Sequence, residues 1–226
     1  MQPGLLIILL ISGYLIGSIP AAYISGKMIK QIDLRQYGSG TVSSSMVWEH
    51  VGHWAVVPVA LFDVFKAAVP VWLTLRFQLG YTAAILTGTT IVIGHNWPIL
   101  LRFRGGRGIS PMIGTLLVLY PPGILWIIAF LLLGRLYEPP VMALIGLTTI
   151  PLVSKLLNGP DYVFLITCIF VGITIAKRLE ANQRILPEST KERFQVLFWR
   201  LIFDRDIANH SEWISRTPGN KEKNLF

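Results

Sequence analysis

Residues 94–108 read GHNWPILLRFRGGRG and place a loop rich in glycine and arginine between two strongly apolar stretches. Across the 226-residue chain, 53% of residues are hydrophobic, 14% are charged and the mean hydropathy is +0.58. A soluble domain typically carries about 25% charged residues. The chain is therefore predicted to be an integral membrane protein, and the loop to be an anion-binding site at the membrane surface.

Seven apolar stretches are interpreted as membrane spans, of which the first three approach the roughly 20 residues that a spanning helix needs. They are residues 4–24, 53–75, 81–99, 109–119, 121–134, 141–157 and 161–176. The run 109–134 is divided into a hairpin of two short or tilted helices, because Tyr120-Pro121-Pro122-Gly123 lies in its middle and proline opposes helical geometry. The predicted fold class is an all-α polytopic membrane protein with seven transmembrane helices.

The positions of the basic residues predict the orientation of these spans. Lysine and arginine collect in segments 25–52, 100–108 and 135–140 and in the C-terminal tail, whereas the loops between them hold only Arg76 and Lys155. Because positive charge marks the cytoplasmic side of short loops, the N-terminus is predicted to lie outside and the tail inside the cell.

Two domains are expected, a membrane domain in residues 1–190 and a cytoplasmic or interfacial tail in residues 191–226. Within the tail, residues 191–203 alternate basic and bulky apolar side chains, as interfacial helices do. In the first span, Gly13 and Gly17 predict close packing of another helix, and Pro20 predicts a kink near the membrane boundary.

Composition also limits the partners of this chain. The net charge of +8 is spread along one membrane face, which favours anionic lipids or a phosphorylated substrate over nucleic acid. The single Cys168 excludes a disulfide within the chain and a thiolate metal cluster. Glu49, His50 and His53 do not complete a zinc site, so neither a metal nor a cofactor is predicted.

The first cytoplasmic loop has the composition of a phosphate cradle. Residues 37–45 read YGSGTVSSS, in which Gly38 and Gly40 let backbone amides turn inward while Ser39 and Ser43 add hydroxyl groups without bulk. Such a run is more often a simple turn, so by itself it is weak evidence for a site.

The loop after the third span also has the composition of a phosphate-binding loop. Arg104 and Arg107 offer guanidinium groups suited to bidentate phosphate contacts, and Gly105, Gly106 and Gly108 offer exposed amides. Arginines beside a span usually only fix topology. Two such loops on the same membrane face nevertheless predict one phosphate-binding pocket.

Three ionisable residues near or within the spans are further candidates. Asp63 and Lys66 fall inside the second span at i and i+3, where they can neutralise one another as a structural ion pair or serve a site. His95 ends the third span and is predicted to donate to a phosphate oxygen or to accept a proton, the alternative being a capping role.

In order and membrane placement, these motifs resemble those of the bacterial acyl-phosphate:glycerol-3-phosphate acyltransferase family, known as PlsY, up to about residue 195. The resemblance is carried by Gly17-Ser18-Ile19-Pro20, Gly38-Ser39-Gly40, Asp63 with Lys66, Gly94-His95 with Pro98, Phe103-Arg104-Gly105-Gly106-Arg107-Gly108, and Glu180 with Arg184. It implies a seven-span fold in the bacterial plasma membrane, with the motif loops on the cytoplasmic face.

The resemblance also implies an activity. Members of that family move a fatty acyl group from acyl phosphate to the 1-hydroxyl of glycerol 3-phosphate, which gives lysophosphatidate for phospholipid synthesis. Acyl phosphate, glycerol 3-phosphate and membrane lipids are then the expected partners. Ser39, His95 and Arg107 are assigned to catalysis, and the remaining site residues to phosphate binding: Gly38, Gly40, Ser43, Arg104, Gly105, Gly106, Gly108 and Arg178.

Several positions depart from the family pattern. In its first loop, which normally reads GSGNxGATNxxR, this chain has Met46 for an asparagine and Glu49 for the arginine, and Ala181 stands where the family tail carries an asparagine. The alternative is therefore a catalytically degenerate member that binds lipids or anions. A small-anion transporter ranks last, because beyond Asp63 and Lys66 the spans supply almost no ionisable path.

Overall fold

The computed structural model describes residues 3–218, so positions 219–226 of the expected tail lie outside the described residues. Within this range the chain forms α-helices and short 3-10 turns and contains no strand. The α-helices are α1 (Pro3–Gly17), α2 (Ala21–Lys30), α3 (Ser44–His50), α4 (His53–Arg76), α5 (Tyr81–Asn96), α6 (Ile109–Leu119), α7 (Pro121–Leu133), α8 (Pro139–Thr148), α9 (Ile150–Leu156), α10 (Tyr162–Glu180), α11 (Thr190–Phe203) and α12 (His210–Ile214). The 3-10 turns are η1 (Leu34–Gln36), η2 (Ile99–Leu101) and η3 (Ala181–Gln183).

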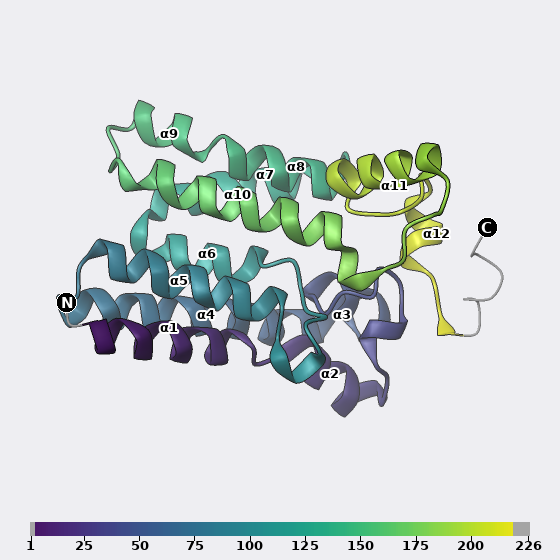
Figure 1. The fold of residues 1–226 in the computed structure, drawn as a ribbon, viewed down its shortest axis with the longest axis horizontal. Helices are drawn as coiled ribbons and strands as arrows, with labels where there is room; N and C mark the ends of the chain where they lie inside the picture. The colour runs from purple at the N-terminus through teal and green to yellow at the C-terminus, as the bar shows by residue number, and fades with distance from the viewer. Residues whose placement is uncertain (1–2, 219–226) are drawn as a thin grey trace.

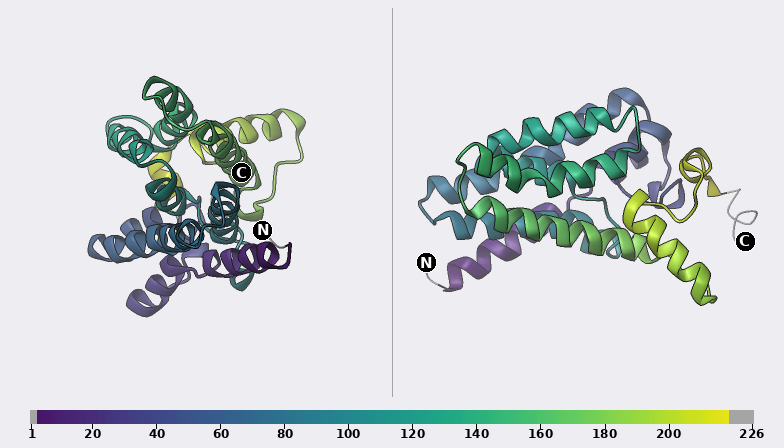
Figure 2. Two further views of the ribbon diagram at one scale, coloured as in Figure 1. Left: turned by 90° about the vertical axis from the view of Figure 1, so that its left-hand side faces the viewer. Right: turned by 90° about the horizontal axis from the view of Figure 1, so that it is seen from above.

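The long helices run alongside one another in a bundle (Figure 1). Helix α5 packs against α1 and α4, and α6 packs against α4. Seen along the bundle, α1 and α4 lie on one side and the helices from α7 to α9 on the other (Figure 2). Helices α2, α3, α11 and α12 gather at the end opposite the N-terminus, and both motif loops lie at this end.

Four helical segments are long and apolar enough to cross a membrane: Pro3–Lys30, His53–Arg76, Tyr81–Leu101 and Tyr162–Gln183. A fifth arises if α8 and α9, bent by 40° at their junction, count as one broken span. Helices α6 and α7 are shorter, and their 11 and 13 residues extend only about 17 and 20 Å, less than the roughly 30 Å hydrocarbon core. Length and composition thus support four to five spans.

The predicted break in the run 109–134 is confirmed. Helix α6 ends at Leu119, Tyr120 has non-helical φ and ψ of −155° and 77°, and α7 begins at Pro121. Proline suits the first position of a helix, where no backbone donor is needed, so Pro121 starts α7 as effectively as it ends α6.

The first predicted span is divided where Pro20 predicted a kink, because α1 ends at Gly17 and α2 begins at Ala21. The two small residues of α1 allow the close packing expected of them. A Cβ atom on Gly17 would overlap the backbone carbonyl of Ile91, and one on Gly13 would overlap the Thr90 hydroxyl. Glycine is therefore needed for α1 and α5 to approach.

The apolar surface of α4 faces outward, and the ionisable pair in the middle of the helix faces inward. Trp54, Phe65 and Trp72 are exposed by more than half, whereas Asp63 and Lys66 on the same helix are buried. A helix in water has the opposite pattern. This arrangement fits a bundle surrounded by lipid, with polar side chains between the helices.

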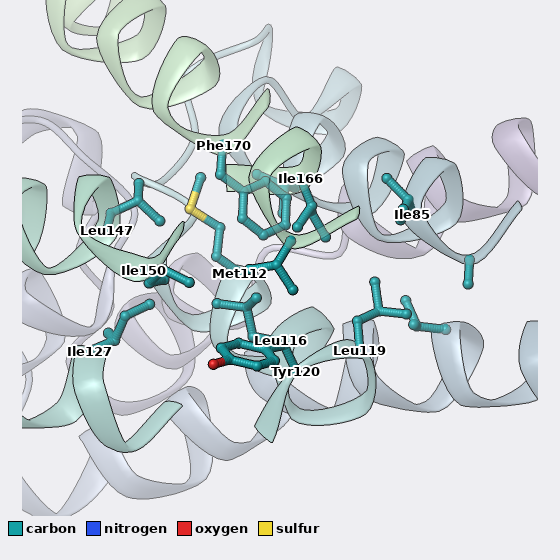
Figure 3. Packing of buried hydrophobic residues seen from close by; sticks show 14 residues of the cluster. Ile85, Met112, Leu116, Leu119, Tyr120, Ile127, Leu147, Ile150, Ile166 and Phe170 are labelled. Carbon is teal, nitrogen blue, oxygen red and sulfur yellow. The ribbon is translucent and has the colours of Figure 1, made fainter. Parts of the chain in front are cut away.

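Of two apolar clusters, one includes Val42 and Leu101 of the motif loops, and the other lies where α6 and α10 meet the surrounding helices. Figure 3 shows Met112 and Leu116 of α6 directed toward Phe170 of α10, with Ile127 and Ile150 closing the cluster from α7 and α9. All five side chains are almost fully buried. This packing holds the helices whose ends carry the motif loops.

Candidate active site

The two motif loops are in direct contact. The Val42 amide donates to the Gly105 carbonyl at 3.1 Å, which joins the serine-rich loop to the glycine-arginine loop. The side-chain amide of Asn182 donates to the carbonyls of Gly40 at 2.9 Å and Gly105 at 3.2 Å. The two loops therefore form one structural unit.

Asn182 is not among the residues predicted from the sequence, although it immediately follows Ala181, the position that aligns with an asparagine of the family. Ala181, Asn182 and Gln183 all have positive φ, between 45° and 63°. Side-chain-bearing residues rarely adopt this conformation, and three in succession are unusual. This strained turn at the end of α10 directs the Asn182 amide to both loops, and strain of this kind is concentrated at functional sites.

A cavity of about 400 Å³ opens beside the joined loops. Its wall combines polar and apolar residues. The polar residues include Ser39, Thr41, Ser43, Glu49, His95, Arg107, Ser110, Arg178 and Asp204. The apolar residues include Leu131, Pro139, Pro140, Ala143 and Phe203. A ligand with a charged head and an aliphatic chain matches this mixed lining.

Three hydroxyl groups of the first loop form a chain along the cavity wall. The Ser39 and Thr41 hydroxyl oxygens are 2.7 Å apart, and those of Thr41 and Ser43 are 3.1 Å apart. Each hydroxyl can both donate and accept a hydrogen bond, so a hydroxyl of this chain can donate to a ligand oxygen. The structure thus places Ser39 and Ser43 at the cavity.

The glycines of the second loop have a different role from the expected one. The amides of Gly105 and Gly106 donate to the carbonyls of Asn96 and His95, at 3.2 and 3.1 Å, and so cap the end of α5. A Cβ atom on Gly105 would overlap the His95 carbonyl, and one on Gly106 would overlap the His95 ring. Both amides already donate to backbone carbonyls, which corrects the expectation that they cradle a phosphate.

The glycines of the first loop are used in the same way. The Gly38 amide donates to the Arg216 carbonyl and the Gly40 amide to the Tyr37 carbonyl, both at 2.8 Å. Both glycines have positive φ, 46° and 70°, so they are needed for the shape of the turn. Gly108, with φ of 81°, precedes α6 and lines the cavity.

His95 belongs to a buried polar cluster with the Asp63–Lys66 pair. The Lys66 ammonium lies 2.7 Å from Asp63 Oδ1 and donates to His95 Nδ1 at 3.1 Å. It also donates to the carbonyls of Gly17 and Ile19, which the break between α1 and α2 leaves without helical partners. Because an ammonium group only donates, His95 Nδ1 is the acceptor, and the neutral ring carries its proton on Nε2.

Arg107 is held between α10 and the C-terminal segment. Its Nη1 donates to the Lys177 carbonyl at 2.9 Å, and its Nη2 lies 2.8 Å from Asp204 Oδ1. Arg107 Nε is buried and has no hydrogen-bond partner among residues 3–218. Burial raises the pKa of the Asp204 carboxyl, against the opposing effect of Arg107 and Arg178. Glu49 lines the same cavity, but the carboxylate paired with Arg107 is that of Asp204.

The other two predicted arginines differ in position. Arg178 lines the cavity, yet its guanidinium donates to the carbonyls of Leu201, Ile202 and Pro140. Arg104 is exposed, donates to the Gln183 side chain at 3.2 Å and does not line the cavity. The structure therefore does not bring Arg104 to the site.

Comparison with known proteins assigns the chain to a family. The model of the family described as "Glycerol-3-phosphate acyltransferase" matches residues 7–188. The chain belongs to the glycerol-3-phosphate acyltransferase family. The match ends two residues before α11, so α11 and α12 lie beyond it.

Curated relatives agree with this assignment. Glycerol-3-phosphate acyltransferase 5 of Dehalococcoides mccartyi is 34% identical over an alignment of 230 positions, which covers 97% of this chain and 98% of the relative. The glycerol-3-phosphate acyltransferase of Alkaliphilus metalliredigens is 33% identical over 189 residues, covering 83% and 95%.

Solved structures share the fold. The crystal structure of PlsY, an integral membrane glycerol 3-phosphate acyltransferase, in its glycerol 3-phosphate form superposes with a TM-score of 0.68. The superposition covers 79% of this chain and 90% of PlsY at 23% identity. The form with lysophosphatidic acid gives a TM-score of 0.69. The all-helical fold of this family member is thus that of an integral membrane protein.

Proposed function

We propose that this chain transfers a fatty acyl group from acyl phosphate to the 1-hydroxyl of glycerol 3-phosphate and so produces lysophosphatidate. The observation that carries the proposal is the cavity beside the joined loops, lined by both polar and apolar residues, in a chain of the glycerol-3-phosphate acyltransferase family. Family membership supports an enzyme over a degenerate binding protein.

The donor phosphate is assigned to Arg107, His95 and the start of α6. The guanidinium of Arg107 offers planar donors, and the neutral His95 ring offers its Nε2 proton. Ile109 and Ser110, the first residues of α6, line the cavity where the positive end of the helix dipole attracts an anion. These groups also stabilise negative charge as it develops on the transferred carbonyl oxygen.

The reaction needs no covalent intermediate on the protein. The acceptor hydroxyl oxygen attacks the acyl carbonyl carbon, the new ester bond forms, and the bond from that carbon to the phosphate oxygen breaks. The hydroxyl proton passes to the departing phosphate, so inorganic phosphate is the second product. Ser39, joined to Thr41 and Ser43 in the hydroxyl chain, orients the acceptor against the carbonyl carbon.

The apolar part of the cavity wall is assigned to the acyl chain. Leu131 of α7 lines the cavity with Pro139, Pro140 and Ala143 of α8, and Phe203 completes the apolar part of the wall. An acyl chain bound against these residues keeps its carbon atoms out of water while its carbonyl group reaches the polar residues of the same cavity.

The proposed topology has seven crossings, with the N-terminus outside and the motif loops on the cytoplasmic face of the bacterial plasma membrane. Residues 1–190 then form the membrane domain and residues 191–226 the cytoplasmic or interfacial tail. The basic loops support this orientation. In a Cys168→Ser background, the variants Arg135→Cys and Arg76→Cys should react with a membrane-impermeant maleimide from opposite sides. Labelling of both from one side would contradict the topology.

The activity is tested with purified protein in lipid vesicles, supplied with a long-chain acyl phosphate and labelled glycerol 3-phosphate. The proposal expects lipid-extractable label and inorganic phosphate in equal amounts. A parallel reaction with acyl-CoA should give neither. Folded protein that binds phosphate but forms no product would support the degenerate alternative, and product from acyl-CoA alone would contradict the donor assignment.

A further inference from the structure

The C-terminal segment 190–218, which lies beyond the family match, forms part of the cavity wall. Phe203, Asp204, His210, Trp213 and Ile214 all line the cavity. In Figure 2 this segment lies at the end of the bundle opposite the start of α1. The chain therefore adds residues to its own site that the matched region does not supply.

The first half of the segment is anchored by buried arginines. Arg205 contacts Glu138 through two hydrogen bonds of 2.8 and 2.9 Å, and these bonds lower the pKa of the Glu138 carboxyl. Arg200 is almost fully buried and donates to the Leu179 carbonyl at 3.1 Å and to Asp206 at 2.6 Å. Asp204 lies between these two anchors.

The second half is tied to the first loop. The Arg216 carbonyl accepts from the Gly38 amide at 2.8 Å, and His50 Nε2 lies 3.0 Å from the Ile214 carbonyl. The Arg184 guanidinium stacks over the Trp213 ring, with 4.2 Å between its central carbon and the ring centre. With both halves anchored, the position of Asp204 is determined by the fold.

Asp204 is paired with one end of the phosphate-binding edge of Arg107. A guanidinium binds a phosphate most strongly through two parallel donors, such as Nε and Nη2. In Arg107, Nη1 donates to the Lys177 carbonyl, Nη2 is paired with Asp204, and Nε is buried without a partner among residues 3–218. A phosphate that binds both Nε and Nη2 of Arg107 therefore meets the Asp204 carboxylate, a like charge, at Nη2.

We infer that Asp204 is an affinity-determining residue of this site, an internal anion that pairs with Arg107 and is displaced when a phosphate group binds. The choice of ligand rests on the proposed function. Because the carboxylate competes with every phosphate ligand, it weakens the binding of the phosphate product together with that of the substrates and thereby speeds product release.

The test measures binding of inorganic phosphate by calorimetry in detergent, without turnover. Asparagine retains the shape of the Asp204 side chain and tolerates the left-handed backbone there, at φ of 56°, so Asp204→Asn preserves the end of α11. The variant should bind inorganic phosphate about tenfold more tightly or better, which corresponds to about 1.4 kcal/mol. In an Arg107→Ala background, the same substitution should have no effect.

Glu49→Gln is the matched control, because it removes the same charge from the same cavity at an exposed position that does not pair with Arg107. Its phosphate affinity should stay within about twofold of the unmodified protein, since exposed charges are screened. Asp204→Ser provides a second removal of the carboxylate, and the melting temperature reports whether each variant is folded.

Unchanged or weaker phosphate binding by both folded Asp204 variants would overturn the inference and make Asp204 a positioning residue for Arg107. An equal gain in Glu49→Gln would also overturn it, since only the general charge of the cavity would then matter. If Asp204→Asn binds phosphate more tightly but the unmodified protein forms no lysophosphatidate, the inference is upheld and the proposed function is rejected.

Discussion

The Lys66 ammonium donates to His95 Nδ1 at 3.1 Å and thereby connects the buried ion pair of α4 to the cavity. Lys66 contacts Asp63, His95 and the carbonyls of the α1–α2 break at once. It therefore joins α1, α4 and α5 and also orients the ring that faces the proposed phosphate.

Lys66→Met should strongly destabilise the protein, because it leaves the Asp63 carboxylate buried and uncompensated. Loss of one partner of a buried pair costs about 3–5 kcal/mol. The double variant Asp63→Asn with Lys66→Met should recover part of that stability. Unfolding in detergent, followed by tryptophan fluorescence, measures both. Equal stabilities of the single variant and the unmodified protein would contradict a compensating role for Lys66.

Arg107→Ala should lower turnover by on the order of a hundredfold or more, because the guanidinium stabilises charge in the transition state. Arg107→Lys should retain more activity than Arg107→Ala but less than arginine, since a single ammonium lacks the planar pair of donors. The vesicle assay gives the rates, and a normal melting temperature shows that folding is retained. An unchanged rate in Arg107→Ala would remove this residue from the mechanism.

Gly106→Ala should reduce activity severely, because its Cβ atom would overlap the His95 ring and displace Nε2. Gly172→Ala is the control, since a Cβ atom there meets nothing within 4 Å and the residue lies inside α10. Alanine in a helix is favoured over glycine by up to about 1 kcal/mol, so this control should be active and slightly more stable. Comparable losses in both variants would rule out the steric explanation.

Asn182→Asp should destabilise the joined loops more than Asn182→Ala does. The alanine variant loses two hydrogen bonds to carbonyl oxygens, at a cost of about 1–3 kcal/mol. The aspartate variant keeps the shape but directs a carboxylate at the same two acceptors. Unfolding midpoints and acyl transfer rates should fall from the unmodified protein to Asn182→Ala and again to Asn182→Asp. An Asn182→Asp variant as stable as the unmodified protein would argue against the proposed bridge.

Lowering the pH should stabilise the unmodified protein relative to Asp204→Asn. Burial raises the pKa of Asp204, which Arg107, Arg178 and Asp206 face. A raised pKa means that the stabilising contribution is fully present below the unfolded value near 3.8 and is lost as the pH rises through the folded value. As the pH is lowered from neutral toward 3.8, the difference in melting temperature between the two proteins should therefore shift toward the unmodified protein. A constant difference would exclude this titration.

The sequence by itself determined the features that depend on local geometry. Apolar runs of sufficient length predicted helices for a membrane, and Pro121 predicted the end of α6, because proline acts on its own backbone and on the residue before it. The spacing of Asp63 and Lys66 placed them on one helical face for the same reason. The family motifs likewise identified both loops, since their residues are contiguous.

Only the tertiary structure decided how those loops are used. The amides of Gly105 and Gly106 cap α5, Asn182 bridges two loops, and Asp204 pairs with Arg107. The glycine contacts fold the loop back onto the end of its own helix, whereas the Asn182 and Asp204 contacts join segments that are far apart along the chain and meet only when the helices pack. Which donors remain for a ligand depends on that packing, since a backbone amide already bonded to a carbonyl is unavailable to a phosphate.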